Sequence, residues 1–237
     1  MQVTVLGKYG PFSVNDGGTS SYLVECGENA VLLDAGSGMT SKMLSKIDIN
    51  NLKFVVLSHM HFDHISDIFV LSYAVSFLKN DKKLKVYMFD DGSASANLIK
   101  NIKEFDIINI NTNTIYNDSG FTFSFYKMAH PVISHGVKLS CNNKTLAYTG
   151  DTTINGDLPS LIDGADLLIA DGCFLSKDHN ENKPHMSALE VANLSKAYNV
   201  LTIVSHIAYN YTDEEVELEL SDYPLTTVAK EGTTYFV

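Results

Sequence analysis

A dense cluster of titratable side chains follows the apolar run "FVVL" at residues 54–57. The next segment, "SHMHFDH", contains His59, His61 and His64 together with Asp63. Neutral imidazole nitrogens and carboxylate oxygens are the ligands that a divalent cation such as zinc accepts in proteins. Because burying these groups without a cation would leave several polar atoms to satisfy, the cluster favours a metal site.

Three further polar residues occupy comparable places, each directly after an apolar run. His130 follows "FYKMA", Asp151 follows "LAYTG" and His206 follows "LTIVS". Taken alone, a strand-end His is more often a hydrogen-bonded, half-buried residue, and "TGD" is more often a turn. Beside the cluster, however, the three residues are predicted to be further ligands. A shared carboxylate can bridge two ions, so the set suits a dinuclear centre.

The spacing within the cluster predicts two groups of ligands. In an extended segment, His59 and His61 point to the same side of the chain. The turn that begins the following helix would bring Asp63 and His64 toward a second position.

Strands and helices must carry these residues to one edge of the molecule. Apolar residues at helical spacing over 68–78 predict a helix with Ser66 as its N-cap. Ser187 and Glu190 have the spacing of a capping box, which predicts a helix over 187–197. Two more helices are expected over 93–105 and 213–220. The expected strands cover residues 2–7, 21–26, 30–36, 53–58, 84–89, 121–128, 145–151, 165–172, 199–206 and 233–237.

Each half of the chain thus combines strands with helices that can cover one face of a sheet. This order predicts two sheets packed together with helices outside them. No long Pro- or Ser-rich linker separates the halves, so residues 1–237 are expected to form a single domain. A hydrophobic content of 45% is ordinary for a chain that buries a core.

Composition restricts the partners and the compartment. The net charge is −11 and the chain contains no Arg, which disfavours a grip on long nucleic acid. No apolar run approaches the roughly 18–20 residues of a membrane span, and no secretory signal is visible, so the expected location is the cytoplasm. Accordingly, the widely spaced Cys26, Cys141 and Cys173 are expected to be reduced core thiols.

The ordered motifs resemble the metallo-beta-lactamase superfamily over nearly the whole chain: "SHMHFDH", then a His, then "TGD", then "SH" after an apolar strand. The resemblance implies an α/β fold, a four-layer αββα sandwich with metals at one edge of the two sheets. It also implies that His59, His61 and His130 hold one ion, that Asp63, His64 and His206 hold a second, and that Asp151 bridges them.

The segments "TSSYLVE", "LLDAGSG", "YTGDTT" and "KPHMSALEVANLSKAYNV" further resemble the RNase Z-like phosphodiesterase branch. In that branch a His shortly before a helix helps the leaving oxygen to depart, and His185 in "PHMS" matches it. The alternative for His185 is a helix-entry residue that is hydrogen-bonded to a carbonyl.

The resemblance implies that two divalent ions, zinc first with manganese or iron as alternatives, turn a bridging water into hydroxide for attack on phosphorus. His185 would protonate the departing alkoxide, and Asp63 would handle the water proton as well as bind metal. Asp171 is a candidate for orienting a ligand His, with a simple turn residue as the alternative. His179, in a polar loop, is expected to be exposed to solvent, and the role of His135 is open.

The sequence also departs from the branch. Its tRNA-processing members carry a basic arm between the third and fourth metal motifs, yet only 20 residues separate His130 from Asp151. A small phosphodiester or cyclic nucleotide is therefore expected as substrate, ahead of pre-tRNA 3' processing. The main alternative is a lactonase, thioesterase or other carbonyl-ester hydrolase on the same metals. A non-catalytic role is disfavoured because all seven ligands are present, and a homodimer is an option that the branch suggests.

Overall fold

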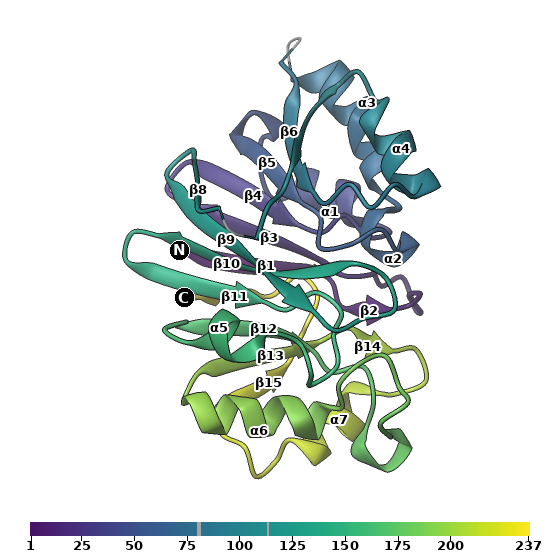
Figure 1. Ribbon diagram of the computed structural model, residues 1–237, viewed down its shortest axis with the longest axis vertical. Helices are drawn as coiled ribbons and strands as arrows, with labels where there is room; N and C mark the ends of the chain where they lie inside the picture. The colour runs from purple at the N-terminus through teal and green to yellow at the C-terminus, as the bar shows by residue number, and fades with distance from the viewer. Residues whose placement is uncertain (80–81, 113) are drawn as a thin grey trace.

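Two β-sheets pack face to face and helices cover the outer face of each sheet (Figure 1). The computed structural model describes residues 1–79, 82–112 and 114–237. The arrangement is the four-layer αββα sandwich that the sequence predicts. The helices on the first sheet are α1 (Met39–Leu44), α2 (Phe62–Ile65), α3 (Ile68–Leu78) and α4 (Ala94–Lys100). Those on the second sheet are α5 (Leu158–Ile162), α6 (Ala188–Tyr198) and α7 (Asp213–Glu219).

The first sheet has the order β16-β1-β3-β4-β5-β6-β7 in the described part of the chain. Its strands are antiparallel from β16 to β4 and parallel from β4 to β7. The bounds are β1 (Gln2–Gly7), β3 (Ser21–Cys26), β4 (Asn29–Leu33), β5 (Leu52–Val56), β6 (Leu84–Met88), β7 (Phe105–Asn109) and β16 (Thr234–Phe236).

The second sheet repeats this plan in the order β15-β13-β12-β11-β10-β9-β8. Its strands are antiparallel from β8 to β11 and parallel from β11 to β15. The bounds are β8 (Tyr116–Asp118), β9 (Phe121–Met128), β10 (Ser134–Cys141), β11 (Lys144–Tyr148), β12 (Leu167–Asp171), β13 (Leu201–Ser205) and β15 (Thr226–Val228). A small parallel pair joins β2 (Tyr9–Gly10) to β14 (Ile207–Ala208).

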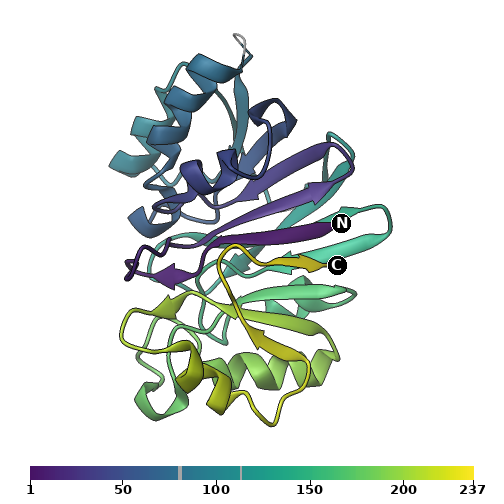
Figure 2. The same ribbon diagram turned by 180° about the vertical axis from the view of Figure 1, so that it is seen from behind.

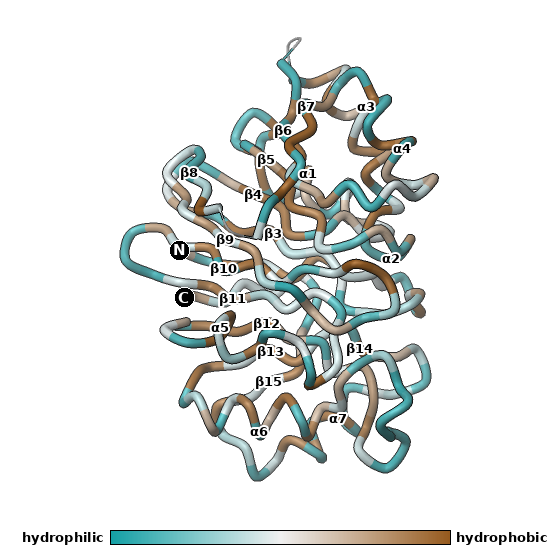
Figure 3. Tube along the Cα trace, viewed as in Figure 1, coloured by the Kyte–Doolittle hydropathy of each residue, from teal (hydrophilic) through white to brown (hydrophobic). Residues whose placement is uncertain are grey.

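Apolar side chains fill the space between the sheets and beneath the helices, as the hydropathy of the strands suggests (Figure 3). Between the sheets, Phe54 from β5 stacks on Phe123 from β9 with ring centroids 5.0 Å apart. Burial of such large aromatic surfaces is the main force that holds the two sheets together.

The two ends of the chain lie side by side on the first sheet (Figure 2). Gln2 of β1 pairs with Phe236 of β16, which confirms the closing strand predicted near the C-terminus. In the part of the chain that the structure describes, each helix is too short or too polar to cross a membrane.

Two boundary predictions are wrong. The helix expected over 93–105 ends at Lys100, and the chain then forms the edge strand β7, which begins at Phe105. Ser66 is not an N-cap, because the helical turn α2 already begins at Phe62 and Ser66 ends it. By contrast, α6 confirms the predicted capping box between Ser187 and Glu190.

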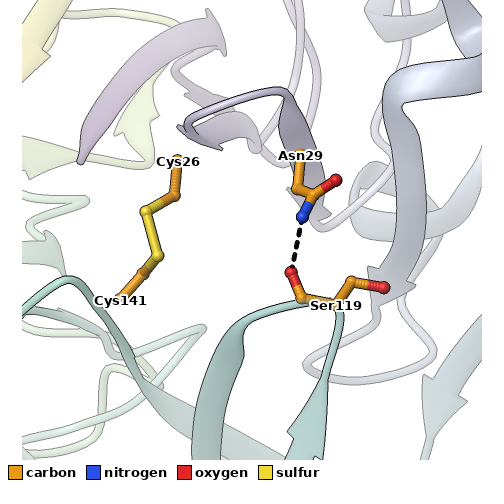
Figure 4. The surroundings of a disulfide bond; sticks show 4 residues. All are labelled: Cys26, Asn29, Ser119 and Cys141. Atoms are coloured by element: carbon orange, nitrogen blue, oxygen red, sulfur yellow. Dashed lines mark hydrogen bonds between the residues drawn. A yellow bond between two sulfur atoms is a disulfide. The ribbon is translucent and has the colours of Figure 1, made fainter.

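The prediction of reduced thiols is wrong for Cys26 and Cys141, which form a disulfide between the two sheets (Figure 4). Cys26 ends β3 and Cys141 ends β10, and their sequence separation of 115 residues gives no local signal of pairing. Beside the bond, the Asn29 side chain donates a hydrogen bond to the Ser119 carbonyl, a second link between the sheets. Cys173 is free and buried, as expected.

Replacing both cysteines, as Cys26→Ser with Cys141→Ser, is expected to lower the free energy of unfolding by about 2–5 kcal/mol, because the bond closes a long loop in the unfolded chain. Urea unfolding of the oxidised parent and the double variant measures the difference. Cys173→Ser is the matched control, which should leave the bond and its contribution intact. Alkylation that labels three thiols in the unreduced, unfolded parent would contradict the pairing.

Candidate metal centre

The sandwich brings every predicted ligand to one edge, where the parallel strands of both sheets end. The segment from His59 to His64 follows β5 of the first sheet. From the second sheet, His130 follows β9, Asp151 follows β11 and His206 follows β13. This edge lies near α2, β2 and β14 in Figure 1. The side chains meet here because the carboxyl ends of neighbouring parallel strands lie at the same edge of a sheet.

The first group of donors comprises His59, His61, His130 and Asp151, whose ligand atoms all lie within 4.8 Å of one another. Nδ1 of His61 lies 3.1 Å from Nε2 of His130. Oδ2 of Asp151 lies 3.6 Å from Nε2 of His59 and 3.8 Å from Nε2 of His130. Three imidazole nitrogens and one carboxylate oxygen thus converge on a single point.

The second group comprises Asp63, His64, His206 and again Asp151, also within 4.8 Å. Here the other carboxylate oxygen, Oδ1 of Asp151, lies 3.1 Å from Nε2 of His64 and 3.3 Å from Nε2 of His206. Oδ2 of Asp63 lies 3.2 Å from Nε2 of His206. Asp151 therefore presents one oxygen to each group, the geometry of a bridging ligand.

The donor atoms are arranged to bind cations rather than to hydrogen-bond with one another. Nε2 of His59, Nε2 of His64 and Oδ1 of Asp151 are buried, and none has a well-formed hydrogen bond. Leaving three such atoms unpaired would cost several kcal/mol in total, since each buried polar group costs about 1–3 kcal/mol without a partner. Imidazole and carboxylate donors in this arrangement suit two divalent ions of the zinc type.

The protonation of these groups follows from burial and mutual charge. Burial lowers the pKa of His59 well below its usual value, and the neighbouring His64 adds to this effect. Burial also opposes the charged form of His64, but the carboxylates of Asp151 and Asp34 outweigh it and raise the pKa to about 10. For Asp151, burial is outweighed by the His206, His64 and His59 imidazoles, which hold its pKa well below the usual range. Ion binding must therefore release protons from the site.

Asp34 is fully buried after β4 and forms four hydrogen bonds, one of which orients a ligand. Nδ1 of His64 lies 2.7 Å from its carboxylate, which fixes Nε2 toward the metal position. The amide and hydroxyl of Ser58 and the Tyr148 hydroxyl donate the other bonds at 2.7, 2.8 and 2.5 Å. Sequence reasoning missed this role, although Asp34 ends an apolar strand just as Asp151 does.

The backbone at His206 is also unusual. This residue has a φ of 57°, which non-glycine residues rarely adopt. Its ring lies against Gly10, where an added Cβ would come within 2.1 Å of the imidazole. The pairing of Ile207 with Tyr9 holds the two segments together. Gly10 is therefore required for the position of His206, and the sequence carries no signal of it beyond a Gly-Pro pair.

The structure also places the residues outside the ligand set. Nδ1 of His185 lies 2.8 Å from Oδ2 of Asp171, and Nδ1 of His206 lies 3.5 Å from Oδ1. Asp171 thus contacts two imidazoles of the centre and is no simple turn residue. The expectation of an exposed His179 is wrong: its side chain is only 16% exposed, and its Nε2 hydrogen-bonds to the carbonyl of His185. His135 is buried at the margin of the centre.

Asp34→Asn is expected to weaken metal binding about 10–100-fold, because the amide cannot accept all four hydrogen bonds and turns a donor toward His64. Competition with a chromophoric zinc chelator measures the affinity. Asp118→Asn, a half-buried carboxylate bonded to Lys85 on the first sheet, serves as the control and should bind metal as the parent does. Equal affinity in Asp34→Asn and the parent would show that His64 needs no such support.

Gly10→Ala is expected to displace the His206 ring and lower the ratio of bound metal to protein chain. Elemental analysis after dialysis against zinc measures this ratio. Gly27→Ala is the matched control, since its Cβ meets no atom within 4 Å and the change only strains a turn. Full metal content in Gly10→Ala would contradict the packing argument.

Comparison with known proteins shows the family to which the chain belongs. The Beta-lactamase superfamily domain matches residues 29–207. Probable metallo-hydrolase YhfI from Bacillus subtilis (strain 168) is 32% identical over 209 residues, which cover 83% of this chain and 82% of YhfI. The crystal structure of YhfI superposes with a TM-score of 0.91 at 28% identity, covering 99% of this chain and 98% of that one.

More distant relatives also match most of the chain. Ribonuclease Z of Saccharolobus solfataricus is 24% identical over 246 residues, which cover 81% of this chain and 83% of that enzyme. A diphosphatase from the PhnP family has a TM-score of 0.79 at 16% identity, covering 100% and 97% of the two chains. The match to the superfamily domain and to YhfI, together with the His and Asp cluster, identifies the chain as a metallo-hydrolase of the metallo-beta-lactamase superfamily.

Proposed function

We propose that the protein is a dinuclear phosphodiesterase that hydrolyses a small phosphodiester such as a cyclic nucleotide. The observation that carries the proposal is the pair formed by His185 and Asp171 beside the two donor groups. The His185 ring lies 5.1 Å from the His130 ring and 4.8 Å from the His206 ring, between centroids. Hydrolysis of a phosphodiester expels a poor alkoxide leaving group, which a proton donor at this place would assist.

Each residue of the pair has a distinct task. The carboxylate of Asp171 accepts the Nδ1 proton of His185, which fixes the orientation of the ring. Nε2 of His185 has no partner within the described ranges, and the side chain is 15% exposed, so this atom can reach a bound substrate. His185 would then transfer the Nε2 proton to the departing oxygen.

Asp63 would serve the attacking side of the reaction. Its carboxylate lies beside His206 at the second donor group, and it is less buried than Asp151. Two bound divalent ions would polarise the phosphoryl group and acidify the attacking water. Asp63 would accept the proton of that water, as well as contribute to metal binding.

Two features support a small substrate rather than tRNA. The residues between His130 and Asp151 are taken up by β10, β11 and the short turns around them, so the described chain carries no protruding arm there. The net charge of −11 also disfavours binding to a long polyanion.

Chelator-stripped protein is expected to regain hydrolysis of bis(p-nitrophenyl) phosphate when zinc or manganese is added, with little turnover of p-nitrophenyl acetate or a lactone. Release of p-nitrophenolate is followed by absorbance and lactone opening by acid release. Metal-restored cleavage of the carbonyl substrates beside an inert phosphodiester would overturn the proposal in favour of a lactonase or thioesterase.

His185→Ala is expected to lower kcat about 100-fold or more for a dialkyl-type diester, but about tenfold or less for a p-nitrophenyl diester, whose leaving group needs little protonation. Metal content should be unchanged in elemental analysis. Lys183→Ala, in the same loop, is the control and should retain the activity of the parent on both diesters. An equal loss on the two leaving groups would assign His185 a structural role instead.

A further inference from the structure

A cavity of about 560 Å³ opens between the two sheets, at the same edge of the sandwich as the metal centre. Phe89 and Asn109 line it from the ends of β6 and β7 in the first sheet. Lys127 and His135, which are register partners on β9 and β10, line it from the second sheet. Its volume suits a ligand of the size of a nucleoside.

The wall of this cavity is bonded to the segments that carry the first group of metal donors. The His135 amide donates a hydrogen bond to the carbonyl of Ser58, the residue before His59. The Ser134 hydroxyl donates to the carbonyl of Asp151 at 2.9 Å. A ligand in the cavity would therefore lie next to a phosphate held at the metal centre.

One wall is aromatic. The Phe89 ring packs against the His135 ring with centroids 5.1 Å apart and an interplanar angle of 35°. Phe89 follows the last residue of β6 and lines the opening of the cavity, where its side chain is only half-buried. A large aromatic surface at such a place can stack on a planar ring.

The second ring of this wall, His135, is polar. It is 4% exposed, and its Nδ1 is buried without a hydrogen-bond partner. Burial, with a further contribution from Lys127, lowers the pKa of His135 to about 4, so the ring is neutral near pH 7. A neutral imidazole offers one donor and one acceptor, which a hydrocarbon ligand would leave unused.

The rim adds a cation and an amide. Lys127 is exposed and forms no ion pair with the residues that the structure describes. The side-chain oxygen of Asn109 accepts a hydrogen bond from the Asp90 amide at 2.9 Å. That bond orients the Asn109 side chain and leaves its NH₂ group to donate. An aromatic wall, hydrogen-bonding groups and a cation together match a planar heterocycle that is joined to a phosphate.

We propose that this cavity binds the nucleoside of a phosphodiester whose phosphate lies at the metal centre, with the base stacked on Phe89. The inference rests on the proposed phosphodiesterase activity and narrows its substrate to nucleotides. Lys127 attracts the anionic ligand, and Asn109 and His135 hydrogen-bond to the base or the sugar.

Two substrates with the same leaving group isolate the contribution of the nucleoside: thymidine 5'-(p-nitrophenyl phosphate) and methyl p-nitrophenyl phosphate. The zinc-loaded parent is expected to have a kcat/KM at least about tenfold higher for the thymidine ester, mainly through KM. Phe89→Ala should remove this preference and keep the rate on the methyl ester. Phe77→Ala, which removes an 82% exposed ring on α3, is the matched control and should keep the preference.

Binding of thymidine 5'-monophosphate, measured by calorimetry on the zinc-loaded protein, provides a readout that does not depend on turnover. Phe89→Ala should weaken it at least fivefold and leave the affinity for inorganic phosphate unchanged. If Phe89→Ala does not fold, Phe89→Leu replaces it, because leucine keeps the apolar volume but not the stacking face.

The outcomes separate the two proposals. Equal kcat/KM on both esters, with Phe89 variants that bind thymidine 5'-monophosphate as the parent does, would overturn the nucleoside site and leave the phosphodiesterase intact. Nucleotide binding that depends on Phe89, in a protein that cleaves neither ester, would overturn the phosphodiesterase and support the site.

Discussion

The carboxylate of Asp151 lies buried between imidazoles from both sheets, and the metal centre is organised around it. One oxygen faces the group that contains His59, and the other faces the group that contains His64. Such a carboxylate is tolerated inside a protein only when positive charge surrounds it. The two sheets must therefore meet with their polar ends aligned, since displacement of either one would leave this charge buried and uncompensated.

The repeated plan of the sheets explains how the chain achieves this alignment. In each sheet, a group of antiparallel strands continues into a group of parallel strands. The ends of β5 in one sheet and of β9, β11 and β13 in the other bring the ligands to one edge. Asp34 and Asp171 lie at the ends of neighbouring strands, behind the ligands. Each carboxylate faces the ring nitrogen of a ligand imidazole that points away from the metal position.

Much of this arrangement could be predicted from the sequence, because the signals are local. The His cluster, the capping box at Ser187 and the apolar runs each depend on a few neighbouring residues. The position of Asp34 was missed although the same pattern marks it, since its partners lie far along the chain. The edge strand β7 was missed because the helical pattern before it continues past Lys100.

Other features depend on how distant segments pack, so local patterns cannot reveal them. The partner of Cys26 is set by the stacking of the sheets, and the closeness of Gly10 to His206 is set by the small β2 and β14 pair. Polar composition suggested an exposed His179, yet the fold of its loop turns it onto the backbone of His185. The partners of Cys26 and Gly10 lie far along the chain, and the contact of His179 depends on how its own loop folds.

The disulfide lies at the end of the sandwich opposite to the metal centre. Cys26 pairs in register with Asn29 at the start of β4, and Cys141 pairs with Lys144 at the start of β11, whereas the ligands follow the ends of the parallel strands. The two sheets are thus linked by a covalent bond at one end, and both contribute metal ligands at the other end. In the absence of ions, the disulfide and the aromatic core would still join the sheets, which limits how far the ligands from the two sheets can separate.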